Sequence, residues 1–177
     1  FRSEELIQHY EARAKGGVGL IVTEVTTVEP TYIYLPGDMS IHDDSFIPGW
    51  KKLTDAVHQY GAKILPQLFH PAYMAFPIPG TPRLIAPSNV GPSYAKEAPR
   101  PVTIEELKVI IRQFGEAALR VKQAGGDGVE IHAAHAHGLL GGFLTPLYNK
   151  RCDEYGGDIN GRLKLTLEVV EEVRSVC

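Results

Sequence analysis

The chain alternates between two patterns of hydrophobic and polar positions. Near the N-terminus, apolar residues recur at helical spacing after Ser3, an N-cap residue, and the pattern stops at Gly16-Gly17. The continuous apolar run over 18–22 that follows is rich in branched side chains and is typical of a strand buried on both faces. A helix followed directly by a buried strand indicates a parallel α/β fold.

The same alternation recurs further along the chain. We expect a helix over about 45–61 and a strand over 63–68. Pro66 should lie near the end of that strand, because proline cannot donate a hydrogen bond to a central ladder. The segments 26–44 and 70–101 lack a sustained period and are expected as loops, and the second is long enough to indicate a functional loop.

The C-terminal half repeats the pattern once more. A helix is expected over 103–125, where Thr103 and Glu106 form a capping box, and a strand over about 128–132. A last helix should begin at about Gly161. The side chains expected to pack this helix are Leu163, Leu167, Val170 and Val173.

Helices and strands therefore alternate at the spacing of right-handed βαβ units, within one domain. Two architectures fit: part of a (β/α)8 barrel, or a small doubly wound sheet. A complete barrel takes about 250 residues, so the 177 residues could supply only part of one. No Gly-x-Gly-x-x-Gly follows a strand, which removes the usual support for a dinucleotide-binding Rossmann domain.

Composition excludes several classes of function. The formal net charge of -3, without a basic run, argues against a nucleic acid partner. The chain lacks an apolar run of the roughly 20 residues that a membrane helix needs, and its N-terminus lacks the layout of a signal peptide. The two cysteines, Cys152 and Cys177, have no metal-site spacing, which favours a reducing compartment. We expect a cytoplasmic protein without a membrane partner.

The candidate chemistry lies after the third predicted strand. His132, His135 and His137 follow it, where we expect the strand to lead into a Gly-rich loop. In parallel α/β folds, catalytic groups gather at the C-terminal ends of strands, where loops present them to a pocket. These three imidazoles could also bind Zn2+ in a metal-dependent hydrolase barrel, and this alternative stays open at this point. A third alternative is a non-catalytic fragment.

A series of motifs surrounds these histidines: EIHAAH at 130–135, FLTP at 143–146, NKR at 149–151, DEYGG at 153–157 and NGR at 160–162. Together these motifs resemble those of the old yellow enzyme family of flavin-dependent ene-reductases. Further stretches at 19–24, 61–68 and 86–88 resemble the same family. The resemblance implies that residues 1–177 form a single, incomplete FMN-binding (β/α)8 barrel domain, from the first to the fourth helix with strands two to four.

The resemblance also implies an activity. Family members pass hydride from NADH or NADPH through FMN to the C=C bond of an α,β-unsaturated carbonyl compound, and some relatives carry a 4Fe-4S cluster and FAD. Because part of the barrel has no counterpart here, we expect the isolated chain to be inactive. Open strand edges make homo-oligomers a further expectation.

The resemblance assigns roles residue by residue. Val25 and Gln67 match positions that contact the flavin, and His132, also beside the cofactor, pairs with His135 to bind the substrate's carbonyl oxygen. The family usually has a tyrosine after the second histidine as proton donor, and an ungapped match to its longer form puts Gly138 there. We therefore expect the adjacent His137 to act as a substitute acid, with solvent as the alternative. The charged cluster Arg151, Asp153, Glu154 and Tyr155 is expected to be a scaffold.

Overall fold

The computed structural model describes residues 4–76, 80, 82–91 and 97–177, so Ser3, the expected first N-cap, lies outside the described residues. Two 3-10 helices cover Asp44–Phe46 and Ala72–Met74. The other elements are α1 (Glu4–Lys15), β1 (Leu20–Thr27), β2 (Met39–Ser40), α2 (Ile47–His58), β3 (Lys63–Phe69), β4 (Ile85–Ala86), β5 (Arg100–Pro101), α3 (Ile104–Gln123), β6 (Glu130–Ile131), α4 (Gly138–Leu144) and α5 (Ile159–Val176).

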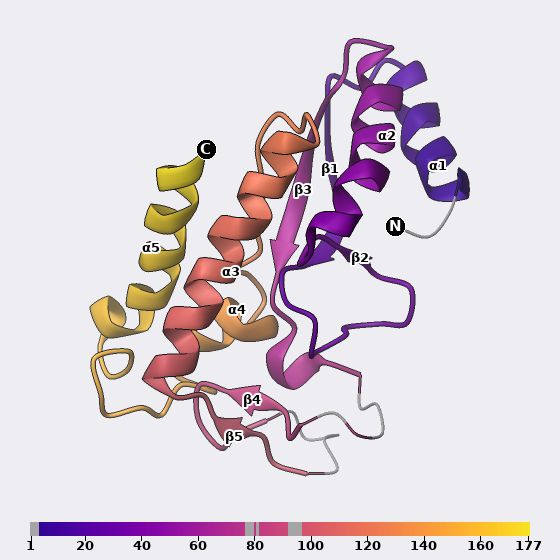
Figure 1. The fold of residues 1–177 in the computed structure, drawn as a ribbon. Helices are drawn as coiled ribbons and strands as arrows, with labels where there is room; N and C mark the ends of the chain where they lie inside the picture. Colours follow the sequence, from indigo (N-terminus) through magenta and orange to yellow (C-terminus); the bar gives the residue numbers. More distant parts are fainter. Residues whose placement is uncertain (1–3, 77–79, 81, 92–96) are drawn as a thin grey trace.

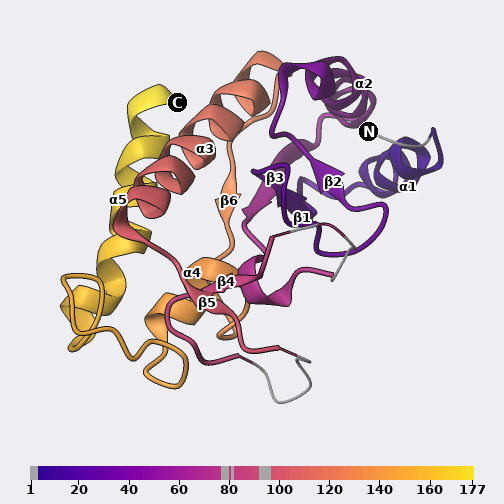
Figure 2. The same ribbon diagram turned by 60° about the horizontal axis from the view of Figure 1, so that its bottom comes forward.

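The main sheet has four parallel strands in the order β2-β1-β3-β6. A second, two-stranded sheet of β4 and β5 forms within the long connection between β3 and α3. Figure 2 shows α2, α3 and α5 along the outer side of the curved sheet, with β6 on the inner side of α3. A doubly wound sheet would carry helices on both faces, so the arrangement matches the expected part of a barrel instead.

The capping box predicted for α3 is confirmed. The Thr103 hydroxyl accepts a hydrogen bond from the Glu106 amide at 3.2 Å, and the Glu106 carboxylate accepts one from the Thr103 amide at 2.9 Å. The Arg100 guanidinium also binds Glu106 through two hydrogen bonds and lowers the pKa of its carboxyl to about 2. The helix thus starts where β5 ends.

Within the described part of the chain, neither α3 nor any other helix is long and apolar enough to cross a membrane.

Strands β1 and β3 differ from the prediction, and one irregularity explains both differences. Pro66 lies in the middle of β3 rather than near its end. The register pairs Val22 with Leu65 and Val25 with Gln67, so two residues of β1 lie opposite Pro66. This bulge removes the need for a ladder hydrogen bond from the proline nitrogen. Strand β1 can therefore continue to Thr27.

The expectation that the first strand is buried on both faces is wrong. Residues of β1 alternate between buried and exposed, and Leu20 and Val22 are 53% and 38% exposed. Their partners Lys63 and Leu65 share the same face, because directly paired residues of parallel strands point to the same side. This is the inner, concave face of the sheet, which lacks a facing strand among the described residues. The apolar pattern of β1 is that of a barrel strand whose inner neighbours are absent here.

The last helix begins two residues earlier than predicted and buries a different stripe. Asp158 caps α5 by accepting hydrogen bonds from the amides of Asn160 and Gly161 at 2.9 and 3.1 Å. The buried side chains of α5 are Leu165, Val169 and Val173. Leu167 is 53% exposed, and Leu163 and Val170 are only half-buried. Of the expected set, only Val173 is fully packed, because α5 packs mainly against α3, with a smaller contact to α4 (Figure 1).

The Gly-rich segment after the histidines is a helix rather than a loop. The seven residues of α4 include three glycines, and all but the last residue are buried. Gly142 has no space for a side chain, since a Cβ there would lie 2.8 Å from the Tyr73 ring. Glycine therefore allows α4 to approach the connection after β3. This close packing, which composition did not indicate, fixes the segment that follows the histidines.

A carboxylate at the surface, that of Asp127, joins three elements at the N-terminal end of the sheet. Asp127 accepts hydrogen bonds from His58 at 2.7 Å and from the Ile64 amide at 3.0 Å, and it pairs with Lys63 at 2.8 Å. Burial alone would raise the pKa of Asp127, but the hydrogen bonds from Lys63, His58 and Ile64 outweigh it and lower the pKa to about 2. A carboxyl whose pKa is lowered by folding stabilises the fold above its unfolded pKa of 3.8.

We therefore predict that Asp127→Asn lowers the free energy of unfolding by about 1–2 kcal/mol at pH 7, because solvent screening reduces the value that the full pKa shift would give. The difference from the wild type should shrink to about half by pH 3, because the native carboxylate loses its advantage as the pH falls toward 2. Urea unfolding of both proteins at pH 7 and pH 3 measures this difference in the free energy of unfolding. Asp55→Asn, which removes an exposed pair with Lys51, is the matched control and should change stability by less than about 1 kcal/mol. An equal loss in both variants would contradict this account.

Candidate active site

A row of side chains crosses the inner face near the C-terminal ends of the strands. Val25 pairs with Gln67 in the β1–β3 register, and Gln67 pairs with Glu130 in the β3–β6 register. The three side chains therefore point to the same side of the sheet. The Gln67 amide donates a hydrogen bond to the Glu130 carboxylate, which orients it across the face. The bulge in β1 matters here, because without it the side chain of Val25 would point outward.

One residue pair further along, Phe69 and His132 continue the inner face. The His132 amide donates to the Leu68 carbonyl at 3.0 Å, and the rings of Phe69 and His132 meet edge to face with centroids 4.9 Å apart. Burial, and to a smaller degree the neighbouring His135, lower the pKa of His132, so its imidazole is neutral at pH 7. Its Nδ1 is buried without a hydrogen-bond partner, which leaves Nε2 as the ring nitrogen able to meet a ligand.

The turn after β6 brings the other two histidines to the same place. His135 and Ala136 both adopt left-handed backbone conformations, with φ of 64° and 52°. The ring centroids of His135 and His137 each lie 5.9 Å from that of His132. Non-glycine residues with positive φ are costly and cluster at functional sites. The three histidines predicted as catalytic therefore gather in one group, held by a strained turn.

The turn is held in place by the connection after β3. The Tyr73 hydroxyl donates to the Ala136 carbonyl at 2.5 Å, and the Leu139 amide donates to the His70 carbonyl at 2.9 Å. His70 itself is fully buried, and burial lowers its pKa to about 3, so its side chain is neutral. This agrees with a structural role for His70. The long connection was expected to be functional, and its described residues support the histidine turn.

His137 lies between two aromatic rings. It stacks on Phe69 with centroids 5.7 Å apart and meets Tyr34 edge to face at 5.2 Å. Burial, followed by the nearby His132 and His135, lowers the pKa of His137. A protonated imidazole at this position is therefore favoured only at acidic pH. The sequence patterns did not single out Tyr34 or Phe69, because they lie far from the histidines along the chain.

An ungapped match to the longer form of the family motif places the usual tyrosine at Gly138, and the surroundings of Gly138 leave no space for such a side chain. Its φ is 63°, and a Cβ added there would collide with the Phe69 ring and lie 2.8 Å from the His70 carbonyl oxygen. A larger side chain cannot occupy this position without moving Phe69. The absence of a side chain at 138 thus allows close contact between α4 and β3.

The charged cluster after α4 is a scaffold, as predicted. The Arg151 guanidinium donates to the carbonyls of Pro87 and Val102 at 3.1 and 2.7 Å and binds Asp153. Its side chain thereby ties the end of α4 to the small β4–β5 sheet. Tyr155 donates to Glu168 of α5 at 2.9 Å, and burial raises its pKa to about 12. These contacts satisfy the polar groups locally.

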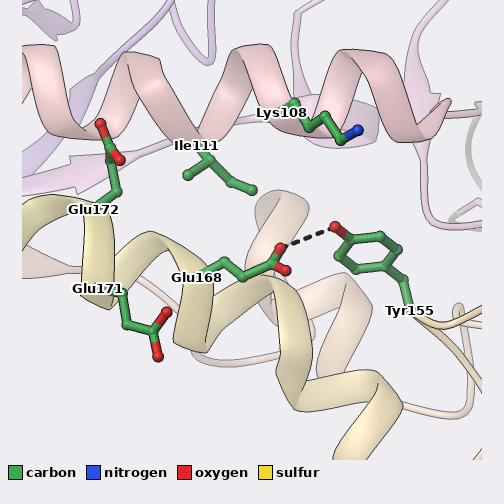
Figure 3. A pocket seen from close by; sticks show the side chains of 6 residues that line it. All are labelled: Lys108, Ile111, Tyr155, Glu168, Glu171 and Glu172. Atoms are coloured by element: carbon green, nitrogen blue, oxygen red, sulfur yellow. Dashed lines mark hydrogen bonds between the residues drawn. The ribbon is translucent and has the colours of Figure 1, made fainter.

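A pocket lies outside the barrel, between α3 and α5. Figure 3 shows its lining, in which Lys108 projects from α3 and the hydrogen-bonded pair of Tyr155 and Glu168 closes one end. The remaining polar lining consists of Glu171 and Glu172. Its excess of carboxylates, with a single lysine, does not resemble a flavin or substrate site. The inner-face row and the histidine group therefore form the candidate active site.

The comparison with known families decides the assignment. Residues 2–177 match the model of the NADH:flavin oxidoreductase / NADH oxidase family. The chain belongs to this family. It is 40% identical over 174 residues to an NADH oxidase from Thermoanaerobacter brockii, covering 97% of this chain and 27% of the relative. It is 42% identical over 171 residues to an NADPH dehydrogenase from Halalkalibacterium halodurans, covering 96% of this chain and 49% of the relative.

Solved structures of flavin oxidoreductases match the same residues. Morphinone reductase superposes with a TM-score of 0.88 at 32% identity, covering 97% of this chain and 50% of that structure. The match confirms the partial (β/α)8 barrel and the old yellow enzyme resemblance. The chain spans between about a quarter and half of the length of these relatives.

The zinc hydrolase alternative finds no support. The relatives are flavin oxidoreductases, and none of the residues that the structure describes form a group of three or more His, Cys, Asp or Glu placed to hold a metal ion. Although the histidines gather, their arrangement suits hydrogen bonding to a ligand rather than metal binding.

The geometry at Gly138 predicts an unusually large cost for a small change. Gly138→Ala should lower the free energy of unfolding by about 3 kcal/mol, because it adds overpacking against Phe69 to the cost of positive φ. Gly61→Ala is the matched control: its φ is 75°, but a Cβ there meets no atom within 4 Å, so it should cost only about 1 kcal/mol. Urea unfolding compares the two. Equal losses would show that only the positive φ, and not close contact with Phe69, makes Gly138 sensitive to substitution.

Proposed function

We propose that this chain forms one side of the active site of an FMN-dependent ene-reductase. The complete protein would transfer hydride from NADH or NADPH, through FMN, to the C=C bond of an α,β-unsaturated carbonyl compound. The observation that carries this proposal is the arrangement of side chains on the inner face of the sheet. Val25 and Gln67 lie in one row and His132 in the next, with two more histidines beside it. The relatives' names, NADH oxidase and NADPH dehydrogenase, support a nicotinamide donor.

The residues on the inner face fit a flavin. Gln67 already donates one N–H to Glu130, which leaves its second N–H and its carbonyl oxygen for a ligand with adjacent acceptor and donor groups. The pyrimidine edge of FMN has such a pattern. Val25, beside Gln67, offers a half-buried apolar surface to a flat ring, and His132 lies one pair further toward the mouth. We propose that these three residues contact the cofactor.

When bound and reduced, FMN supplies the hydride. His132 and His135 would donate hydrogen bonds to the substrate's carbonyl oxygen, where negative charge develops as the hydride reaches the β-carbon. The lowered pKa of His132 is compatible with this role, since a neutral imidazole keeps one N–H and can donate it from Nε2. Donors already in place at such an oxygen each contribute about 3 kcal/mol to the lowering of a barrier.

We propose that His137 is the third catalytic histidine and acts as an acid in its protonated form. Because burial lowers its pKa, the protonated fraction falls as the pH rises from acidic values toward neutrality. Its contribution to protonation of the substrate would fall over the same range. Solvent is the alternative proton source.

We further propose a reducing, cytoplasmic location and a small-molecule substrate. Cys152 and Cys177 are both exposed and free, which suits a compartment where thiols stay reduced. In the isolated chain, the apolar inner face of β1 stays uncovered, so that preparation is expected to be inactive and to form homo-oligomers. From the family resemblance, we also propose that the complete protein carries a 4Fe-4S cluster and FAD.

The test uses the complete flavoprotein under anaerobic conditions, with 2-cyclohexen-1-one as the unsaturated carbonyl probe. His132→Ala and His135→Ala should each lower kcat for alkene reduction by about 100-fold, because each removes a donor to the developing oxyanion. His9→Ala, on the exposed surface of α1, is the control and should match the wild type. Unchanged alkene reduction in both histidine variants would refute the proposed role.

Flavin binding is tested separately. Gln67→Ala should lower the amount of FMN that the complete protein retains after desalting, measured by absorbance at about 450 nm. Gln123→Ala, at the exposed end of α3, is the matched control. Equal retention in the two variants would remove Gln67 from the cofactor site.

A further inference from the structure

The hydroxyl groups of the tyrosines divide into two sets. Five described tyrosine hydroxyls donate hydrogen bonds within the protein, and they belong to Tyr10, Tyr32, Tyr60, Tyr73 and Tyr155. In the part of the chain that the structure describes, only the hydroxyls of Tyr34 and Tyr148 lack such a bond. Of these two, only Tyr34 touches the histidine group.

Tyr34 lies beside the histidine group of the candidate active site. It comes from the connection between β1 and β2, and its half-buried ring meets Phe69 and His137 edge to face, with centroids 5.4 and 5.2 Å apart. Phe69 in turn contacts His132. The phenol therefore reaches the histidine group from a third element of the fold, while its hydroxyl stays free for a ligand.

The connection that carries Tyr34 is fixed on both sides. On one side, the Glu29 carboxylate is only 5% exposed and accepts hydrogen bonds from the Thr31 and Tyr32 amides at 2.7 and 2.5 Å. On the other side, the Leu35 amide donates to the Asp38 carboxylate at 2.5 Å, and the Asp38 amide donates to the Leu35 carbonyl at 3.1 Å. The backbone around Tyr34 is thus held by two carboxylates, as a residue with a fixed position in a site requires.

Two other positions at the site, among the residues that the structure describes, are poor proton donors at neutral pH. Gly138 has no side chain, and its surroundings do not admit one. His137 can give a proton readily only when it is protonated, and burial shifts that form to acidic pH. A tyrosine hydroxyl, in contrast, keeps its proton throughout the neutral range. It can therefore act as an acid without a prior protonation step.

We propose that Tyr34 donates the proton that the α-carbon receives when the alkene is reduced at neutral pH. This inference rests on the proposed function. Hydride from reduced FMN forms the new C–H bond at the β-carbon, and the π electrons of the C=C bond pass to the α-carbon and the carbonyl oxygen held by His132 and His135. The α-carbon then takes the hydroxyl proton of Tyr34, and water returns a proton to the phenolate.

The test is Tyr34→Phe in the complete flavoprotein, which keeps the ring contacts with Phe69 and His137 and removes only the hydroxyl. At pH 8, reoxidation of the reduced flavin by 2-cyclohexen-1-one should slow by at least about 100-fold, the usual effect of losing a general acid. Reduction of the flavin by NADPH or NADH needs no proton at this carbon and should stay within about twofold. Cyclohexanone, a saturated probe measured by flavin difference absorbance, should bind with a dissociation constant within about twofold of the wild-type value.

Tyr148→Phe, which removes the other free hydroxyl, is the matched control and should behave as the wild type. A normal rate of reoxidation in Tyr34→Phe would overturn the inference while leaving the proposed function intact. A larger loss in His137→Ala than in Tyr34→Phe at pH 8 would assign the proton to His137 and also overturn it. If the wild-type protein does not reduce the enone, the proposed function and this inference fail together.

Discussion

The candidate site depends on the register between β1 and β3. Pro66 cannot donate to the ladder, and the bulge opposite it adds one residue to β1. That extra residue reverses the alternation, so Val22 and Val25 both point to the inner face. Gln67 and the residues beyond it on β3 then line up with Val25 and with β6. Pro66, which is unusual in the middle of a strand, thus helps to orient the side chain of Val25 toward the site.

Beyond the strands, the site is built from close contacts of small residues and strained backbone. The left-handed residues His135 and Ala136 turn the chain back, and the Tyr73 hydroxyl holds the turn through the Ala136 carbonyl. Gly138 then lets α4 pack directly on Phe69. The backbone strain of about 1–3 kcal/mol at each such residue is offset by this packing. As a result, three histidines within six positions of the chain form one group, in which the rings of His135 and His137 each lie 5.9 Å from that of His132.

Much of this fold follows from the sequence, and the failures have physical causes. Hydrophobic periodicity located α1, α2, α3 and β3, and the family motifs located the histidines. The length of β1 was underestimated because a bulge has no signature in a hydrophobic pattern. The buried stripe of α5 was misplaced because several apolar residues of that helix fit more than one face, and the contacts with α3 and α4 decide which face packs.

Contacts that are distant in sequence could not be predicted from a pattern. Tyr34 meets His137 across about a hundred residues of chain, and Phe69 meets His132 across about sixty. The sheet creates both contacts by bringing the ends of three strands together. Periodicity therefore predicts elements, whereas the composition of a site depends on the register between them.

The most direct test of the central claim is a crystal structure of the complete protein with FMN and cyclohexanone bound. The account predicts that the flavin ring lies against Val25 and Gln67, with the ketone oxygen within about 3.2 Å of the Nε2 atoms of both His132 and His135. A flavin bound elsewhere, or a ketone oxygen that contacts neither histidine, would contradict it.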